Sequence, residues 1–219
     1  MTTFPGSPQL LKGGIVLLNP DNGTPIRVIV LQYNPDTLTR TLQIQGIGPE
    51  SGDRMEVFRL KAPPIETIKL DAEIDATDQM ETATPGSTVS ALGIFPQLAA
   101  LETMVYPSSG QLRANDSQSQ MGTLEIAPAE APLSLFVWSP TRVVPVRFTD
   151  FSITEEAFDT SLNPIRAKVS LGMRVLSVND LGFTHKGGTL FMTYLQQKEQ
   201  LVTKAPAGSV AALGLKGNP

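Results

Sequence analysis

The sequence predicts a mainly β protein, a small antiparallel β-barrel or sandwich with one flanking α-helix and a second helix near the C-terminus. Residues 165–175 and 68–75 both alternate strictly between apolar and polar side chains, which is the period of a strand with one buried face. Turn-forming residues separate further short apolar stretches. A chain of 219 residues fits one such domain, because barrels and sandwiches of about 200 to 250 residues commonly form a single domain.

The domain organisation follows from where this patterning stops. We expect a single β domain over residues 1–202 and a flexible C-terminal tail over residues 203–219, which is rich in Gly and Ala. Residues 107–132 are rich in Ser, Gly, Pro, Gln and Asp, so we expect a long polar loop with a short strand at 121–126.

The first strands are predicted from residues 13–45. Residues 13–33 indicate a hairpin, because NPDNGTP supplies residues that tolerate the positive φ of tight turns. The second strand of this hairpin, IRVIVLQY, is apolar at nearly every position, which predicts a strand covered on both faces. The Thr-rich residues 34–45 predict a further strand with a polar edge.

The clearest strand signal before the middle of the chain is PPIETIKLDAEID. Its apolar side chains Ile68, Leu70, Ala72 and Ile74 point one way and its charged side chains the other. Burying each of the larger apolar residues stabilises the fold by about 1.5 to 3 kcal/mol. A one-residue slip would bury the charges, so this pattern fixes the register.

Two stretches have helical periodicity. The one well-formed internal helix is predicted over SALGIFPQLAALETMVYP, where Pro96 is tolerable only in a first turn. Its apolar positions are Phe95, Leu98, Leu101 and Val105. A weaker pattern over residues 189–202 predicts a second helix, with Thr189 as its cap. Its apolar positions are Phe191, Tyr194, Leu195 and Leu201.

The strand at residues 165–175 has the most regular pattern. Its apolar set, predicted to face the core, is Ile165, Ala167, Val169, Leu171, Met173 and Val175. Its other face carries Arg166, Lys168 and Arg174. These cations face water, a substrate or another copy of the chain.

Composition excludes several classes of function. The net charge of −4 gives no basic field for nucleic acid, so we expect no nucleic-acid partner. With no cysteine and one histidine, a disulfide framework or a transition-metal site is not expected. No signal peptide and no membrane-spanning run of about 18 apolar residues is apparent, so we expect no membrane insertion and a cytoplasmic site of synthesis.

Few residues suggest chemistry. His185, between glycines in GFTHKGG, lacks a local nucleophile or orienting carboxylate and is interpreted as a surface loop residue. The acidic group Asp71, Glu73, Asp75, Asp78 and Glu81 does not have the spacing of a cation-binding loop, so a solvated or interfacial face is the preferred interpretation.

A second acidic group could support hydrolysis. Two carboxylates that flank a cleft can hydrolyse glycosides, and Glu155, Glu156 and Asp159 are close in sequence. They lie at a strand-to-loop transition without an aromatic sugar platform. We therefore expect no enzymatic activity, no cofactor and no bound metal.

Three stretches together resemble the tube-domain proteins of contractile injection systems and phage tails. LQYNPDTLTRTLQ is similar to the opening of that family, and PPIETIKLDAEIDATD to its next strand. FVWSPTRVVPVRFTDFSITEEAFDTSLNPIRAKVSLGMRVL resembles its closing block. With GIFPQLAALETMVYP at the place of the family's helix, the resemblance covers roughly residues 10–200.

The resemblance implies a tail-tube fold assembled into hexameric rings. It also implies a role in a baseplate, as an adaptor that joins the trimeric spike hub to the inner tube, so the expected partners are the chain itself, the inner tube protein, the hub and other baseplate components. The particle would be phage-tail-like, kept in the bacterial cytoplasm or released by lysis. Many such adaptors carry a LysM module, for which the segment after Val202 is too short. The 107–132 loop favours the adaptor over a bulk tube subunit.

This structural hypothesis predicts lateral docking of copies. A head-to-tail ring needs two different complementary surfaces on each subunit, and opposite charges on two strand faces would set the register between neighbours. The candidate interface residues are Arg166, Lys168 and Arg174 on one strand and Lys69, Asp71, Glu73 and Asp75 on the other. The alternative function is a barrel that binds a small ligand or a glycan, since small barrels can enclose one ligand.

Overall fold

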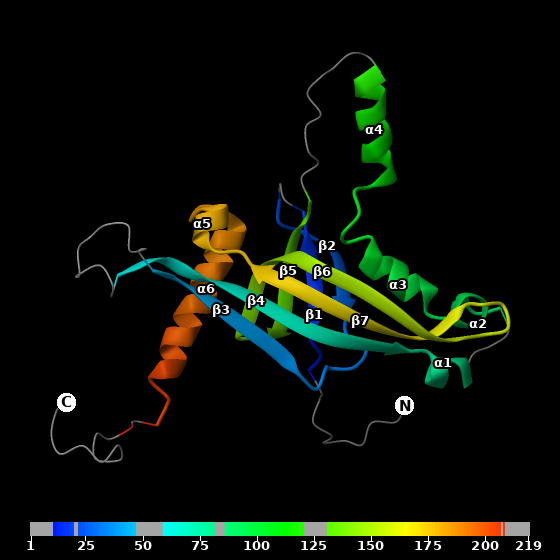
Figure 1. The fold of residues 1–219 in the computed structure, drawn as a ribbon, viewed down its shortest axis with the longest axis horizontal. Coiled ribbons are helices and arrows are strands. Elements are labelled where there is room, and N and C mark those ends of the chain that lie inside the picture. The colour runs from blue at the N-terminus through cyan, green and yellow to red at the C-terminus, as the bar shows by residue number, and fades with distance from the viewer. Residues whose placement is uncertain are drawn as a thin grey trace.

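The computed structural model describes residues 11–19, 22–46, 59–81, 86–120, 131–206 and 208. It is mainly β, as predicted, and its strands form one seven-stranded sheet in which all neighbours are antiparallel (Figure 1). The strands are β1 Gly14–Leu18, β2 Pro25–Val30, β3 Leu38–Gly46, β4 Leu60–Asp75, β5 Leu133–Ser139, β6 Arg142–Phe158 and β7 Pro164–Val175. The helices are α1 Thr77–Glu81, α2 Thr88–Leu92, α3 Phe95–Glu102, α4 Ser109–Gln120, α5 Val178–Leu181 and α6 Lys186–Val202.

The sheet does not close. The strand order is β2-β1-β5-β6-β7-β4-β3, so in the described part of the chain β2 and β3 are edge strands that do not pair with each other. The predicted barrel is therefore wrong in this respect, and the antiparallel sheet is confirmed. The alternation of apolar side chains predicted which face each strand buries, but closure depends on the partner of each edge, which alternation does not specify.

The predicted core of β4 and β7 is confirmed. The even-numbered apolar residues of β4, from Ile68 to Ile74, are at most 8% exposed. The odd-numbered residues of β7 from Ala167 to Val175 are at most 3% exposed, and Ile165 packs against the same core. Strand β7 pairs with β4 in the register Ile68↔Met173 and Ile74↔Ala167. The buried side chains of the two strands therefore lie on the same face of the sheet.

The hairpin of β1 and β2 is also confirmed, but the burial predicted for its second strand is wrong. Ile26, Val28 and Val30 of β2 are 55%, 59% and 58% exposed, although Ile29 packs against the core. A continuous apolar run is typical both of a strand covered on two faces and of an edge strand with an exposed apolar face. The chain takes the second arrangement.

Helices α3 and α6 confirm the two helical predictions only in part. The first predicted stretch is divided between α2 and α3, and Val105 lies beyond the end of α3. Leu98 and Leu101 of α3 are buried, and Pro96 lies in its first turn, but Phe95 is exposed. In α6, Phe191 and Tyr194 are buried, whereas Leu201 is exposed. The predicted cap Thr189 is wrong, because α6 begins three residues earlier and half-buried His185 is its N-cap, accepting a hydrogen bond from the Gly187 N–H.

Helix α4 replaces part of the predicted loop at 107–132. It projects away from the sheet, and none of its residues is buried (Figure 1). Its sequence, SGQLRANDSQSQ, is polar on every side, so it has no apolar stripe from which periodicity could predict a helix. The strand predicted at 121–126 and most of the predicted tail lie outside the described residues. Among the described helices, none is both long and apolar enough to cross a membrane.

Candidate functional site

All seven predicted interface residues lie on one polar face of two adjacent strands, β4 and β7. Lys69, Asp71, Glu73 and Asp75 alternate with the buried residues of β4, and Arg166, Lys168 and Arg174 alternate with those of β7. The register sets Asp75 opposite Arg166 and Glu73 opposite Lys168. The structure therefore brings together the two rows that the sequence predicted.

The two rows form ion pairs with each other. Arg166 Nε lies 2.8 Å from Asp75 Oδ2, and Lys168 Nζ lies 3.3 Å from Asp71 Oδ2. The Ser170 hydroxyl donates to Asp71 Oδ1 at 2.6 Å. Arg174 pairs instead with Asp180 of α5, at 2.7 Å.

Two carboxylates of this face, Asp71 and Asp75, are stabilised in their charged form. The hydrogen bond from Ser170, followed by the contact with Lys168, lowers the pKa of Asp71. Hydrogen bonds from Thr77, followed by the pair with Arg166, lower the pKa of Asp75. Lys168, Asp71 and Arg166 remain 45–52% exposed, so these pairs are open to water.

This geometry corrects one part of the interface hypothesis. Opposite charges were expected to meet across a subunit boundary, but the acidic and basic rows sit on neighbouring strands of the same sheet, so they pair within the chain. Lys69 and Glu73 make no ion pair among the described contacts. A role of this face at a subunit boundary stays a prediction.

The two sheet edges form a second candidate surface. Strand β2 pairs with β1 alone and β3 with β4 alone, so within the described residues the outer side of each has no strand partner. Ile26, Val28 and Val30 on β2 and Leu42 and Ile44 on β3 are exposed, Ile44 at 74%. Natural sheets usually protect their edges with charges, prolines or bulges. Each edge strand here has an arginine and an irregular register, and β2 begins at a proline, but both still present exposed apolar side chains.

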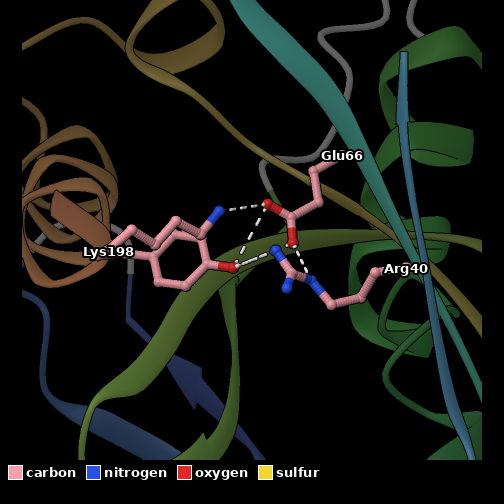
Figure 2. Close-up of polar contacts among 4 residues, drawn as sticks. Arg40, Glu66 and Lys198 are labelled. Atoms are coloured by element: carbon pink, nitrogen blue, oxygen red, sulfur yellow. Dashed lines mark hydrogen bonds and ion pairs between the residues drawn. The ribbon is translucent and has the colours of Figure 1, made fainter. Parts of the chain in front are cut away.

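A buried carboxylate that sequence reasoning missed holds α6 against the sheet. Glu66 of β4 is 3% exposed, and Figure 2 shows its carboxylate between Arg40 of β3 and Lys198 of α6; Tyr194 of α6 also contacts it. Arg40 Nε donates to Glu66 Oε1 at 2.7 Å, Lys198 Nζ to Oε2 at 3.0 Å and the Tyr194 hydroxyl to Oε1 at 3.0 Å. Arg40 Nη2 also donates to the Tyr194 oxygen at 3.0 Å.

These contacts keep Glu66 ionised. Burial alone would raise the pKa of this carboxyl, but the hydrogen bonds from Arg40 and Lys198, with their charges, outweigh burial and lower it. The ammonium of Lys198 also lies 3.9 Å from the centre of the Tyr194 ring. A sequence signal was present, because Glu66 precedes Ile68 on the apolar face of β4 at the strand period.

The second acidic group divides into a turn residue, Asp159, and two exposed residues, Glu155 and Glu156. Asp159 accepts hydrogen bonds from the Ser161 and Asn163 N–H groups and from the Asn163 amide, so it holds the turn between β6 and β7. The bond from the Asn163 side chain contributes most to the lowered pKa of Asp159. Glu155 and Glu156 are exposed at the end of β6, next to a bulge in its pairing with β7.

No metal centre emerges from the acidic group on β4 and α1. Within the described ranges, no cluster of three or more His, Asp or Glu side chains could hold an ion, and the side chain of Asp78 lies outside them.

Neither a protein-family model nor a curated protein sequence matches the chain.

Proposed function

We propose that this chain is a structural subunit of a contractile injection system or phage-tail baseplate, with a fold of the tail-tube type, which forms a hexameric ring between the spike hub and the inner tube. The observation that carries the proposal is the open seven-stranded sheet, whose two edge strands present apolar side chains. The number of copies comes from the resemblance of the sequence to tube-domain proteins.

The character of β2 supports assembly through the edges. A flat edge with exposed β-branched residues pairs readily with another strand, and natural monomers avoid such edges. In β2 this protection is limited to Pro25, Arg27 and one register shift, and Ile26, Val28 and Val30 remain more than half exposed. Burying three such side chains against a neighbour would contribute about 1.5 to 3 kcal/mol each.

The difference between the two edges supports a head-to-tail ring. Strand β2 is apolar apart from one arginine, whereas β3 alternates Thr and Gln with Leu, Ile and one arginine and is therefore the more polar edge. Two unlike edges form a heterologous contact, and such contacts close into rings when the rotation between neighbours allows it. In this ring the polar face of β4 and β7 faces the wet lumen or a neighbouring subunit.

The partners would meet the ring at its two ends. Helix α4 is polar, exposed and projects from the body, so it is the element we assign to contacts with the hub or other baseplate proteins. A helix of 12 residues is marginal in water on its own, and a docking partner would stabilise it.

The test is assembly of the purified full chain, followed by native mass spectrometry and negative-stain microscopy. We expect six-copy rings at high concentration or on addition of the inner tube and hub proteins. Replacing Ile26 and Val28 together by Lys should abolish the rings without changing the circular dichroism spectrum, because both side chains are exposed.

Gln196→Lys together with Gln200→Lys on α6 is the matched control and should leave rings intact, since it adds the same two charges to the exposed side of a helix. A chain that stays monomeric and binds neither the tube protein nor the hub would contradict the proposal.

A further inference from the structure

The turn between β6 and β7 presents an apolar patch at one end of the molecule. Leu162 is 78% exposed at its apex, and Phe158 is 49% exposed beside it. Leu92 and Phe95, at 44% and 52%, flank Gly93 and Ile94, which contact the base of the turn. We call these four residues the β6–β7 tip. Apolar patches of this kind, rimmed by polar residues, mark interaction sites.

The tip is held in one conformation. The Ile94 N–H donates to the Pro164 carbonyl at 2.8 Å, and the Asn163 amide donates to the Ala91 carbonyl at 3.1 Å. Gly93 has φ +57, and a Cβ there would lie 2.1 Å from the Pro164 oxygen, so only glycine permits this approach. Leu162 itself has φ 64, an uncommon conformation for a leucine. The fold therefore fixes an exposed leucine instead of letting it collapse onto the surface.

The rim of the tip is acidic. Glu155 and Glu156 at the end of β6 are exposed, and Asp159 lies in the turn itself. Arg166, the nearest cation on β7, is paired with Asp75, and it lines a hollow with Glu156 in which acidic side chains outnumber the basic ones. The tip therefore presents apolar side chains inside a negative rim.

The opposite end of the molecule carries a groove of the complementary kind. A groove of about 370 Å³ lies between the start of β4 and α6, and its walls include Leu60, Pro63, Phe191 and Leu195. Lys61 on its rim is exposed, and Lys198 is one-third exposed while it contacts Glu66. We call this surface the β4–α6 groove. Figure 1 shows the β6–β7 turn and the start of β4 at opposite ends of the long axis.

We propose that the β6–β7 tip of one copy inserts into the β4–α6 groove of a second copy. The side chains of Leu162 and Phe158 enter the groove, and Glu155 and Glu156 meet exposed Lys61 at its rim, while Lys198 stays paired with Glu66. Charge complementarity identifies a second copy as the occupant, because both surfaces belong to this chain and their charges are opposite.

The contact is heterologous and joins copies end to end. Each copy keeps a free tip at one end and a free groove at the other, so the association propagates. It uses neither edge strand, and it therefore goes beyond the proposed ring and does not depend on it.

The test is sedimentation velocity over a range of concentrations with variants that spare the fold. Leu162→Asn removes the apolar apex, and asparagine tolerates the positive φ of this position. Leu60→Asp with Lys61→Glu changes two exposed residues of the groove. We expect each variant to weaken end-to-end association on the order of tenfold or more, the loss that corresponds to one large apolar side chain.

Mixing the two variants gives the decisive result. A tip variant keeps its groove and a groove variant keeps its tip, so an equimolar mixture should form dimers that cannot extend, although neither variant dimerises alone at that concentration. Arg147→Glu on the exposed face of β6 is the control for charge reversal and should associate like the wild type.

Two outcomes would overturn the proposal: variants that associate as strongly as the wild type, or a mixture that shows no dimer. The ring variants Ile26→Lys and Val28→Lys separate the two proposals, since they should abolish rings and leave end-to-end association unchanged.

Discussion

Two groups of ion pairs connect strands of the same sheet, and they differ in how much water reaches them. The side chain of Glu66 is 4% exposed and contacts two cations and a phenol, and these contacts link β3, β4 and α6. On the outer face of β4 and β7, Asp71 and Lys168 are 52% and 45% exposed and link only neighbouring strands.

The difference in exposure means that the two groups of ion pairs should contribute differently to stability. A buried carboxylate without its cations would carry an uncompensated charge, so removal of one partner is costly. Exposed ion pairs contribute little to the free energy of unfolding, because water and salt already screen the attraction between their charges. The cluster of Glu66, Arg40, Tyr194 and Lys198 should therefore hold α6 and the wall of the groove in place. Substitutions on the outer face should cost the fold little stability.

The largest effect is expected for Glu66→Gln. This change leaves Arg40 and Lys198 without a counter-charge and should reduce the free energy of unfolding by about 3 kcal/mol, at the lower end for a broken buried pair because both cations are partly exposed. Urea denaturation measures the change. The control is Glu73→Gln, exposed on the same strand, and equal losses for the two variants would contradict the comparison.

The next effect is a dependence on pH. Because the pKa of Glu66 is lowered in the folded chain, its stabilising contribution is complete above the unfolded pKa of about 4.3 and is lost as the pH falls through the lower folded value. The difference in stability between the wild type and Glu66→Gln should therefore shrink below pH 4. Denaturation curves at several pH values measure it, and a constant difference would refute this role of the carboxylate.

A smaller effect is expected for Tyr194→Phe. The change removes the hydroxyl that donates to Glu66 and accepts from Arg40, and hydrogen bonds to charged groups contribute about 1.5 to 3 kcal/mol. We expect a loss near the lower value, because Arg40 and Lys198 still contact the carboxylate. Additivity of this loss with that of Glu66→Gln would argue against a single cluster, and a double-mutant cycle tests it.

The smallest effect is expected for Lys168→Gln on the outer face. The pair with Asp71 is half exposed, so the free energy of unfolding should fall by about 0.5 kcal/mol at most. The same variant should be examined for ring assembly. If rings are lost while stability is kept, the predicted interface role of Lys168 is supported; if rings persist, Lys168 is removed from the interface.

The sequence predicted those elements whose two faces differ. Strands β4 and β7 were predicted because burial on one face imposes a period of two, and α6 because Phe191 and Tyr194 recur at helical spacing. The burial predicted for β2 is wrong because an edge strand with an exposed apolar face has the same sequence pattern as a central strand. Helix α4 buries no residue, so it imposes no period at all.

The site was predictable only in part, for a similar reason. The charged face of β4 and β7 follows from alternation within each strand, but the fact that the two rows are neighbours depends on the strand order. Glu66 was visible as a polar residue in an apolar row. Its partners Arg40 and Lys198 lie 26 and 132 residues away, and no local pattern identifies them.

The strand order also determines the direction of any sheet that continues from one copy to the next. Seven strands that are all antiparallel to their neighbours leave β2 and β3 pointing the same way, because the number is odd. If β2 of one copy pairs with β3 of the next around a ring, the new pair is parallel, with slanted hydrogen bonds and slightly lower stability per residue. Each ring would then contain one parallel junction per subunit, and we expect it to open first at those junctions.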